Sequence, residues 1–260
     1  MCLVVFAWKA RPGLTLAVAA NRDEYHRRPT ARAAFWPGAP DVLAGRDLEA
    51  GGTWMGVTRA GRFAFLTNHR DPPAHRDGAP SRGALVAEFL KGEAPPGDFL
   101  RKKESEAALF NGFHLVVGDL SGLWYLTNTA GGSGSLPRRL APGIHGLSNG
   151  PLDDPWPQTK RSKSRLEGLL GGATPPDPAP LLDLLADRER AGDADLPSTG
   201  VPLEWERLLS APFVESESYG TRSSTALLVT LDGVRFVERT FETGTLAPPD
   251  VDVYFPLGTP

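Results

Sequence analysis

The feature that most constrains the fold is a pair of apolar segments at the start of the chain. Residues 2–8 form an almost unbroken apolar run, and residues 14–20 form a second one. Arg11-Pro12-Gly13 lies between them and supplies a turn. Two such runs predict an antiparallel hairpin buried on both faces. The hairpin must then belong to a sheet with a further layer on each side.

Segments with helical periodicity gather in the middle of the chain, and strand-like runs lie on both sides of them. Ser81 is placed to be the N-cap of the first helix. The expected helices are residues 81–90, 158–170, 179–190 and 203–209. The further expected strands are residues 53–58, 62–67, 114–119, 123–128, 144–148, 225–231 and 234–242.

Strand runs that follow one another without regular helical crossovers indicate antiparallel sheets with segregated helices. The expected class is therefore α+β, as a four-layer αββα sandwich of two antiparallel sheets. Pro- and Gly-rich stretches at residues 94–97, 171–180 and 196–202 predict loops, because the composition does not change across them. With 260 residues, 40% of them hydrophobic, residues 1–260 are expected to form a single domain.

The charge of the chain and its one cysteine limit the partners and the compartment. A net charge of -3 does not favour nucleic acid as a partner. One cysteine excludes an internal disulfide and is typical of a reducing compartment, so we expect a cytoplasmic protein. No apolar run reaches the roughly eighteen residues of a membrane span. His69, Asp71, His75 and Asp77 alternate, but Pro72-Pro73 between them favours a loop over a metal site.

The nucleophile that the sequence offers is Cys2, since the chain has no Gly-x-Ser-x-Gly elbow and no P-loop. Removal of Met1 would leave Cys2 with a free α-amino group. This amine titrates near pH 8 and can accept the proton of the thiol, so that one residue is nucleophile and base. If Met1 stays, the amine is an amide and this chemistry is disabled. The other interpretation of Cys2 is a small apolar residue that starts a buried strand.

A polar segment, Asn21-Arg22-Asp23-Glu24, directly follows the second strand. If the hairpin is symmetric about Pro12-Gly13, residue i pairs with residue 25 minus i, and Cys2 lies opposite Asp23. A carboxylate in that place can orient the N-terminal amine and the thiol. Pro-Gly favours a type II turn, which tight hairpins avoid, so a register shifted by one residue is the alternative.

These residues, with motifs spread over most of the chain, resemble the NRDE proteins, also called the transport-and-Golgi-organisation family. The resemblance implies a fold like that of the N-terminal nucleophile (Ntn) hydrolases. For eukaryotic members it implies a role in secretory organisation and in the handling of haem and acyl-CoA. The matching motifs, in order, are Met1-Cys2-Leu3, Ala19-Ala20-Asn21-Arg22-Asp23-Glu24, Arg28-Pro29-Thr30, Leu43-Ala44-Gly45-Arg46-Asp47-Leu48, Gly51-Gly52-Thr53-Trp54, Leu66-Thr67-Asn68, Gly146-Leu147-Ser148-Asn149, Asp154-Pro155-Trp156-Pro157 and Tyr219-Gly220-Thr221-Arg222-Ser223-Ser224-Thr225.

The chain is similar, more distantly, to the choloylglycine and penicillin V acylase group of Ntn hydrolases, which cleave amides with an N-terminal cysteine. On the matching positions this resemblance implies Cys2 as the nucleophile and Asp23 as the aspartate of the site. It also implies that the side-chain amide of Asn149 and the backbone N–H of Asn68 hold the oxyanion. Their other interpretation is turn chemistry, because asparagine ends strands readily.

The same group has an arginine where this chain has Ala20, and Arg22 and Arg222 are the two candidates to replace it. The function we expect is hydrolysis of a C–N amide bond in a small or acyl-chain substrate, with no cofactor. The alternative is a non-catalytic carrier of haem or an acyl ligand on an Ntn scaffold. The chain has no Cys-x-x-Cys-His motif, so haem would be held non-covalently.

Overall fold

The computed structural model describes residues 2–129, 136–172, 176–242 and 245–257, with the backbone alone for Cys2 and residues 245–249. The chain forms two compact units. Unit 1 is Met1–Arg27 with Pro142–Phe255, and unit 2 is Arg28–Ala141 with Pro256–Pro260. Within the described residues, every helix is too short or too polar to serve as a membrane span.

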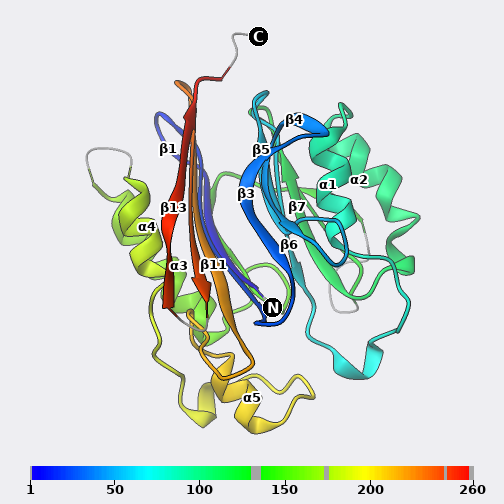
Figure 1. The fold of residues 1–260 in the computed structure, drawn as a ribbon, viewed down its shortest axis with the longest axis vertical. Coiled ribbons are helices and arrows are strands. Elements are labelled where there is room, and N and C mark those ends of the chain that lie inside the picture. The colour runs from blue at the N-terminus through cyan, green and yellow to red at the C-terminus, as the bar shows by residue number, and fades with distance from the viewer. Residues whose placement is uncertain (1, 130–135, 173–175, 243–244, 258–260) are drawn as a thin grey trace. The chain divides into compact units, whose positions relative to one another are not determined.

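Unit 1 is built on a six-stranded antiparallel sheet in the order β10-β1-β2-β11-β12-β13 (Figure 1). The N-terminal hairpin forms as expected, with Gly13 in the left-handed conformation (φ 77°) that its turn requires. The strands are β1 (Cys2–Arg11), β2 (Leu14–Tyr25), β10 (Gly143–Leu147), β11 (Tyr219–Thr230), β12 (Val234–Glu242) and β13 (Thr245–Phe255).

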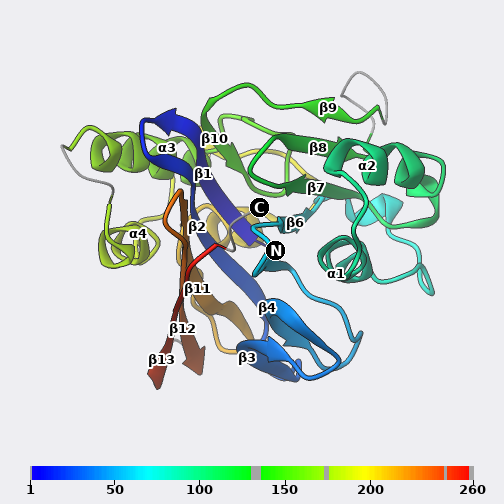
Figure 2. The ribbon, with the colours of Figure 1, turned by 90° about the horizontal axis from the view of Figure 1, so that it is seen from above.

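Helices α3 (Pro157–Leu170) and α4 (Pro178–Leu184) cover one face of this sheet, and Figure 2 shows α3 beside β1 and β10. Leu3, Val5, Ala17 and Ala19 pack there against the helices, which assigns the odd-numbered positions of the hairpin to this face. The short helices η3 (Asp193–Asp195) and α5 (Leu203–Leu208) precede β11.

Unit 2 is built on a seven-stranded antiparallel sheet in the order β3-β4-β5-β6-β7-β8-β9. Helices α1 (Gly83–Lys91) and α2 (Pro96–Glu104) pack on it through a core that includes Phe89 and Phe99. The strands are β3 (Thr30–Trp36), β4 (Ala39–Asp47), β5 (Met55–Thr58), β6 (Phe63–Asn68), β7 (Phe113–Gly118), β8 (Leu123–Thr127) and β9 (Arg138–Arg139). The 3-10 helices are η1 (Pro72–Ala74) and η2 (Ala107–Leu109).

The α+β class with two antiparallel sheets is confirmed, and the expected strands are present with shifted ends. Four expectations are wrong in detail. The helix expected at 179–190 ends at Leu184, and the N-cap of α1 is Arg82 and not Ser81. Residues 94–97, expected as a loop, contain the start of α2, and 171–180 contains the start of α4. In both helices the proline that indicated a loop occupies the first helical turn, where its missing N–H costs nothing.

Candidate functional site

The pairing of β1 with β2 places Arg22, and not Asp23, opposite Cys2. The hairpin count of 25 minus i is therefore wrong by one residue along most of the ladder. Trp8 pairs with Leu16 and Arg11 with Leu14, so residues 9 and 10 of β1 oppose residue 15 alone. Lys9 takes a positive φ of 44° in this bulge. The bulge shifts every pair between it and Cys2.

Arg22 and Asp23 project from opposite faces of β2, because successive strand residues alternate. Asn21 shares a face with Asp23, and its Nδ2 donates to the carbonyls of Leu185 (3.0 Å) and Pro212 (2.8 Å) beyond α4. Asp23 accepts a hydrogen bond from Thr221 Oγ1 at 2.7 Å. Both Arg22 and Asp23 are buried, with 5% and 6% of their surfaces exposed. Asp23 therefore lies on the helix-covered face, which is the face that Arg22 does not share.

Arg222 occupies a bulge in β11, where Thr221 pairs with Asp23 and Ser223 with Arg22. Its Nη1 donates to the carbonyls of Tyr25 (3.0 Å) and His26 (2.9 Å), so it fastens the chain that leaves β2. Burial and the positive charge of Arg22 lower the pKa of Arg222. Of the two candidate arginines, Arg22 is the one that stands opposite Cys2.

Asn149 follows β10, the other neighbour of β1. The ladder between them ends at the pair Val4 and Leu147, two residues after Cys2 on one strand and two before Asn149 on the other. Antiparallel strands lie about 4.8 Å apart. Asn149, which is 2% exposed, and Cys2 thus lie at the same end of adjacent strands in unit 1.

The loop that carries Asn149 is closed by Asp153. The Asp153 N–H donates to the Gly146 carbonyl at 2.8 Å, and the Gly146 N–H donates back to Asp153 Oδ1 at 2.9 Å. His145 Nδ1 and Lys163 Nζ also contact this carboxylate, at 2.8 and 2.5 Å. These hydrogen bonds outweigh its burial and hold the pKa of Asp153 well below the usual range. Asp153 therefore stays ionised and fixes both ends of the Asn149 loop.

Asn68 is the last residue of β6 and belongs to unit 2, where it pairs with Phe113 of β7. The next residue, His69, donates its N–H to the Gly112 carbonyl at 2.9 Å. Hydrogen-bonded and non-hydrogen-bonded pairs alternate in an antiparallel ladder, so the Asn68 N–H points away from β7. The expectation that the Asn68 N–H and the side-chain amide of Asn149 hold the same oxyanion stays a prediction.

Among the residues described, no group of three or more His, Cys, Asp or Glu side chains has the geometry of a metal site. His75 contacts Asp77 at 3.7 Å, while His69 bonds to His114 instead. Asp153 and Thr221 were not predicted from the sequence as parts of the site. Thr221 lies within a matching motif, which was the available signal. Asp153 directly precedes the motif Asp154-Pro155-Trp156-Pro157, and this position was the one sequence feature that pointed to it.

The chain matches a family model described as Transport and Golgi organisation 2 over residues 1–243. The bovine and human Transport and Golgi organization protein 2 homologs are each 36% identical to it, with 92% of each chain covered. The Drosophila melanogaster protein of that name is 27% identical, with the same coverage.

Solved structures of Ntn hydrolases share the fold. A mutant conjugated bile acid hydrolase from Clostridium perfringens aligns with a TM-score of 0.54 and 9% identity, covering 96% of this chain and 92% of that one. The N-acylethanolamine-hydrolyzing acid amidase ortholog of Caenorhabditis elegans aligns with a TM-score of 0.53 and 13% identity, covering 87% and 92%. The fold is therefore Ntn hydrolase-like, as expected. The matched residues and the close relatives together establish that the chain belongs to the Transport and Golgi organisation 2 family.

Proposed function

We propose that the protein is a cysteine amidohydrolase of the Ntn type. It cleaves the C–N amide bond of a small substrate with an acyl chain, and Cys2 is the nucleophile. The observation that carries this proposal is the order of four adjacent strand ends in unit 1. Asn149 follows β10, Cys2 starts β1, Arg22 and Asp23 lie near the end of β2, and Thr221 lies near the start of β11.

The reaction requires removal of Met1, which lies outside the described residues. The Cys2 thiol gives its proton to its own α-amine, and the sulfur attacks the carbonyl carbon of the amide. The tetrahedral oxyanion accepts a hydrogen bond from the side-chain amide of Asn149. The C–N bond then breaks, the ammonium proton passes to the leaving nitrogen, and a thioester remains on Cys2.

Water completes the cycle. The free α-amine takes one proton from the water as its oxygen attacks the thioester carbon, and the C–S bond breaks. The products are a carboxylic acid and an amine, and the thiol regains its proton. No cofactor enters the scheme. Arg22 is the cation beside the nucleophile, where a positive charge favours the thiolate.

Asp23 has a positioning role in this proposal. Its carboxylate accepts from Thr221 Oγ1 at 2.7 Å, and Thr221 Oγ1 accepts from the Val214 N–H at 2.9 Å. The Asp23 carbonyl also accepts from the Tyr219 hydroxyl at 3.0 Å. These bonds tie the ends of β2 and β11 to the segment before β11. The strand end that carries Arg22 is thereby held in place.

The proposed substrate class is supported by the fold neighbours, which are named for conjugated bile acids and N-acylethanolamines. Each of these joins an acyl group to an amine. The test is hydrolysis of an N-acylethanolamine, a conjugated bile acid and penicillin V, followed by release of free amine and free acid. Wild type should cleave at least one of the three. Cys2→Ala should abolish cleavage, and Ser105→Ala, at an exposed residue after α2, should not change it.

The opposite result would favour the carrier. If none of the three amides is cleaved, and saturable binding of haem or acyl-CoA survives Cys2→Ala, the protein is a binding protein on the Ntn scaffold. A carrier does not need the thiol. Binding that is lost with Cys2 would instead identify the sulfur as a ligand.

A further inference from the structure

A second candidate site lies in unit 2, where the side chains of His69, His114 and Tyr125 form a chain of hydrogen bonds. His114 of β7 is fully buried. Its Nε2 is 3.2 Å from Nδ1 of His69, and its Nδ1 is 2.8 Å from the hydroxyl oxygen of Tyr125. Burial, with the positive charge that His69 can carry, lowers the pKa of His114 to about 3. His114 is therefore neutral at physiological pH, with one ring donor and one ring acceptor.

This arrangement fixes the orientation of His69 and is compatible with either ring tautomer of it. When Nδ1 of His69 carries a proton, it donates to Nε2 of His114, and His114 Nδ1–H donates to the Tyr125 oxygen. When Nδ1 of His69 is bare, the Tyr125 hydroxyl donates to His114, and Nε2–H of His114 donates to His69. In both states the buried His114 keeps two hydrogen bonds.

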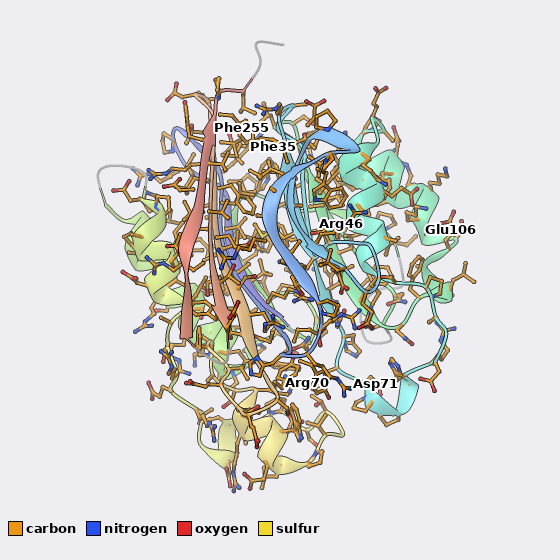
Figure 3. All side chains as sticks on the ribbon, viewed as in Figure 1. Phe35, Arg46, Arg70, Asp71, Glu106 and Phe255 are labelled. Carbon is orange, nitrogen blue, oxygen red and sulfur yellow. The ribbon has the colours of Figure 1, made fainter. Side chains whose placement is uncertain are left out.

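His69 lines a cleft of about 390 Å³ at the end of β6, β7 and β8, beside η1 and η2. This volume is within the range of small-ligand sites. Figure 3 labels Asp71, another lining residue, next to η1. The wall also includes apolar surface from Ala74, Ala108 and Phe110.

Two guanidinium groups line the same cleft, and each donates to backbone carbonyls. Arg76 Nη2 donates to the carbonyls of Ala108 (2.9 Å) and Phe110 (2.6 Å), and Arg82 Nη1 donates to the carbonyl of Gly112 (3.0 Å). A guanidinium presents its N–H groups as a planar fork, whose geometry matches carboxylate and phosphate oxygens.

We propose that this cleft binds a small organic anion, with a carboxylate or phosphate group held by His69, Arg76 and Arg82. The carbon part of the ligand would lie against Phe110 and the two alanines. Asp71 is the one carboxylate among the described lining residues, so the formal charge of the arginines exceeds it by one. Asp71 can accept a hydrogen bond from a hydroxyl or ammonium group elsewhere on the ligand. This site is separate from the proposed hydrolase chemistry and does not depend on it.

The probes are inorganic phosphate and acetate, added to the wild-type protein at constant ionic strength with chloride as the reference salt. The readout is the ring nitrogen signals of the five histidines by NMR. We expect saturable shifts of His69 with phosphate or acetate, and not with chloride. His145 of unit 1, whose ring bonds to Asp153, is the internal control and should not shift.

If only phosphate gives saturable shifts, the ligand is assigned to the phosphate esters. If only acetate gives them, the ligand is assigned to the carboxylates. Arg76→Met should weaken the binding by about tenfold, as expected for loss of a charge-assisted hydrogen bond. Arg101→Met removes the same charge from α2 and should leave it unchanged. Shifts that do not saturate, that chloride reproduces, or that affect His145 equally would overturn the proposal. Equal weakening by Arg101→Met would also overturn it, because the effect would then be one of net charge.

Discussion

Arg22 stands opposite Cys2 in the pairing of β1 with β2, and 5% of its surface is exposed. A buried cation beside a thiol favours the thiolate and lowers the thiol pKa. The chain has one cysteine, so alkylation by iodoacetamide reports on this thiol alone.

Replacement of Arg22 by Gln should therefore raise the pKa of the Cys2 thiol and slow alkylation at neutral pH by roughly three- to tenfold. The measurement is the alkylation rate as a function of pH. Arg222→Gln is the matched control, because the Arg222 guanidinium donates to the carbonyls of Tyr25 and His26. Equal rates for wild type and Arg22→Gln would refute the role of Arg22, and a larger effect of Arg222→Gln would move that role to Arg222.

Asp153 holds the loop of Asn149 by bonds to Gly146, His145 and Lys163. Asp153→Asn should destabilise unit 1 by about 1 kcal/mol, less than the roughly 1.5–3 kcal/mol of a hydrogen bond to a charged group, because 36% of the side chain is exposed. If Asn149 holds the oxyanion, turnover should fall while KM changes little. Asp98→Asn, at a surface ion pair in α2, should affect neither quantity.

The stabilisation by Asp153 has a defined pH dependence. Its folded pKa is lowered, so the stabilisation is present above the ordinary aspartate pKa of about 4 and is lost as the pH falls toward the folded value. The difference in unfolding free energy between wild type and Asp153→Asn should shrink below about pH 4. Urea titrations from neutral to acidic pH measure it. A difference that grows with acidity would contradict the assignment.

The sequence predicted the elements of the hairpin but not its register. The apolar runs and the Pro12-Gly13 turn are local signals, whereas the bulge at residues 9 and 10 arises from how β1 meets β2. β3, β4, β9 and β13 were not predicted. β13 contains Pro248 and Pro249, which argue against a strand. Both lie in a bulge of this edge strand, between the pairs Glu238–Val251 and Thr240–Ala247, and proline is tolerated at edges and bulges.

The candidate site was predictable where a residue lies at the end of a strand and in a matching motif. Asn149 and Cys2 belong to this class, and their strands are neighbours in unit 1. The supporting contacts were not predictable, because they join residues far apart in the chain. Thr221 and Asp23 are separated by 198 positions, and only the pairing of β11 with β2 brings them together.

His114 makes the protein sensitive to acid. Its folded pKa of about 3 lies below the ordinary histidine value of about 6.5, so the unfolded chain takes up the proton first. Stability should therefore fall as the pH drops from about 6.5 toward 3, by up to about 1.4 kcal/mol per unit from this group. His114→Phe should be less stable at neutral pH and should have a shallower acid slope over this range. An unchanged slope would show that His114 does not carry the proton uptake.

In the proposed reaction Cys2 becomes the N-terminal residue and forms a thioester with the acyl group of its substrate. Intact mass spectrometry of the purified protein, before and shortly after addition of an N-acylethanolamine, tests both parts at once. We expect a starting mass without Met1, followed by a transient increase equal to the acyl group less one hydrogen. Cys2→Ala should not give this increase. A protein that retains Met1 in full and still cleaves amides would contradict the account, as would an acyl adduct that forms equally in Cys2→Ala.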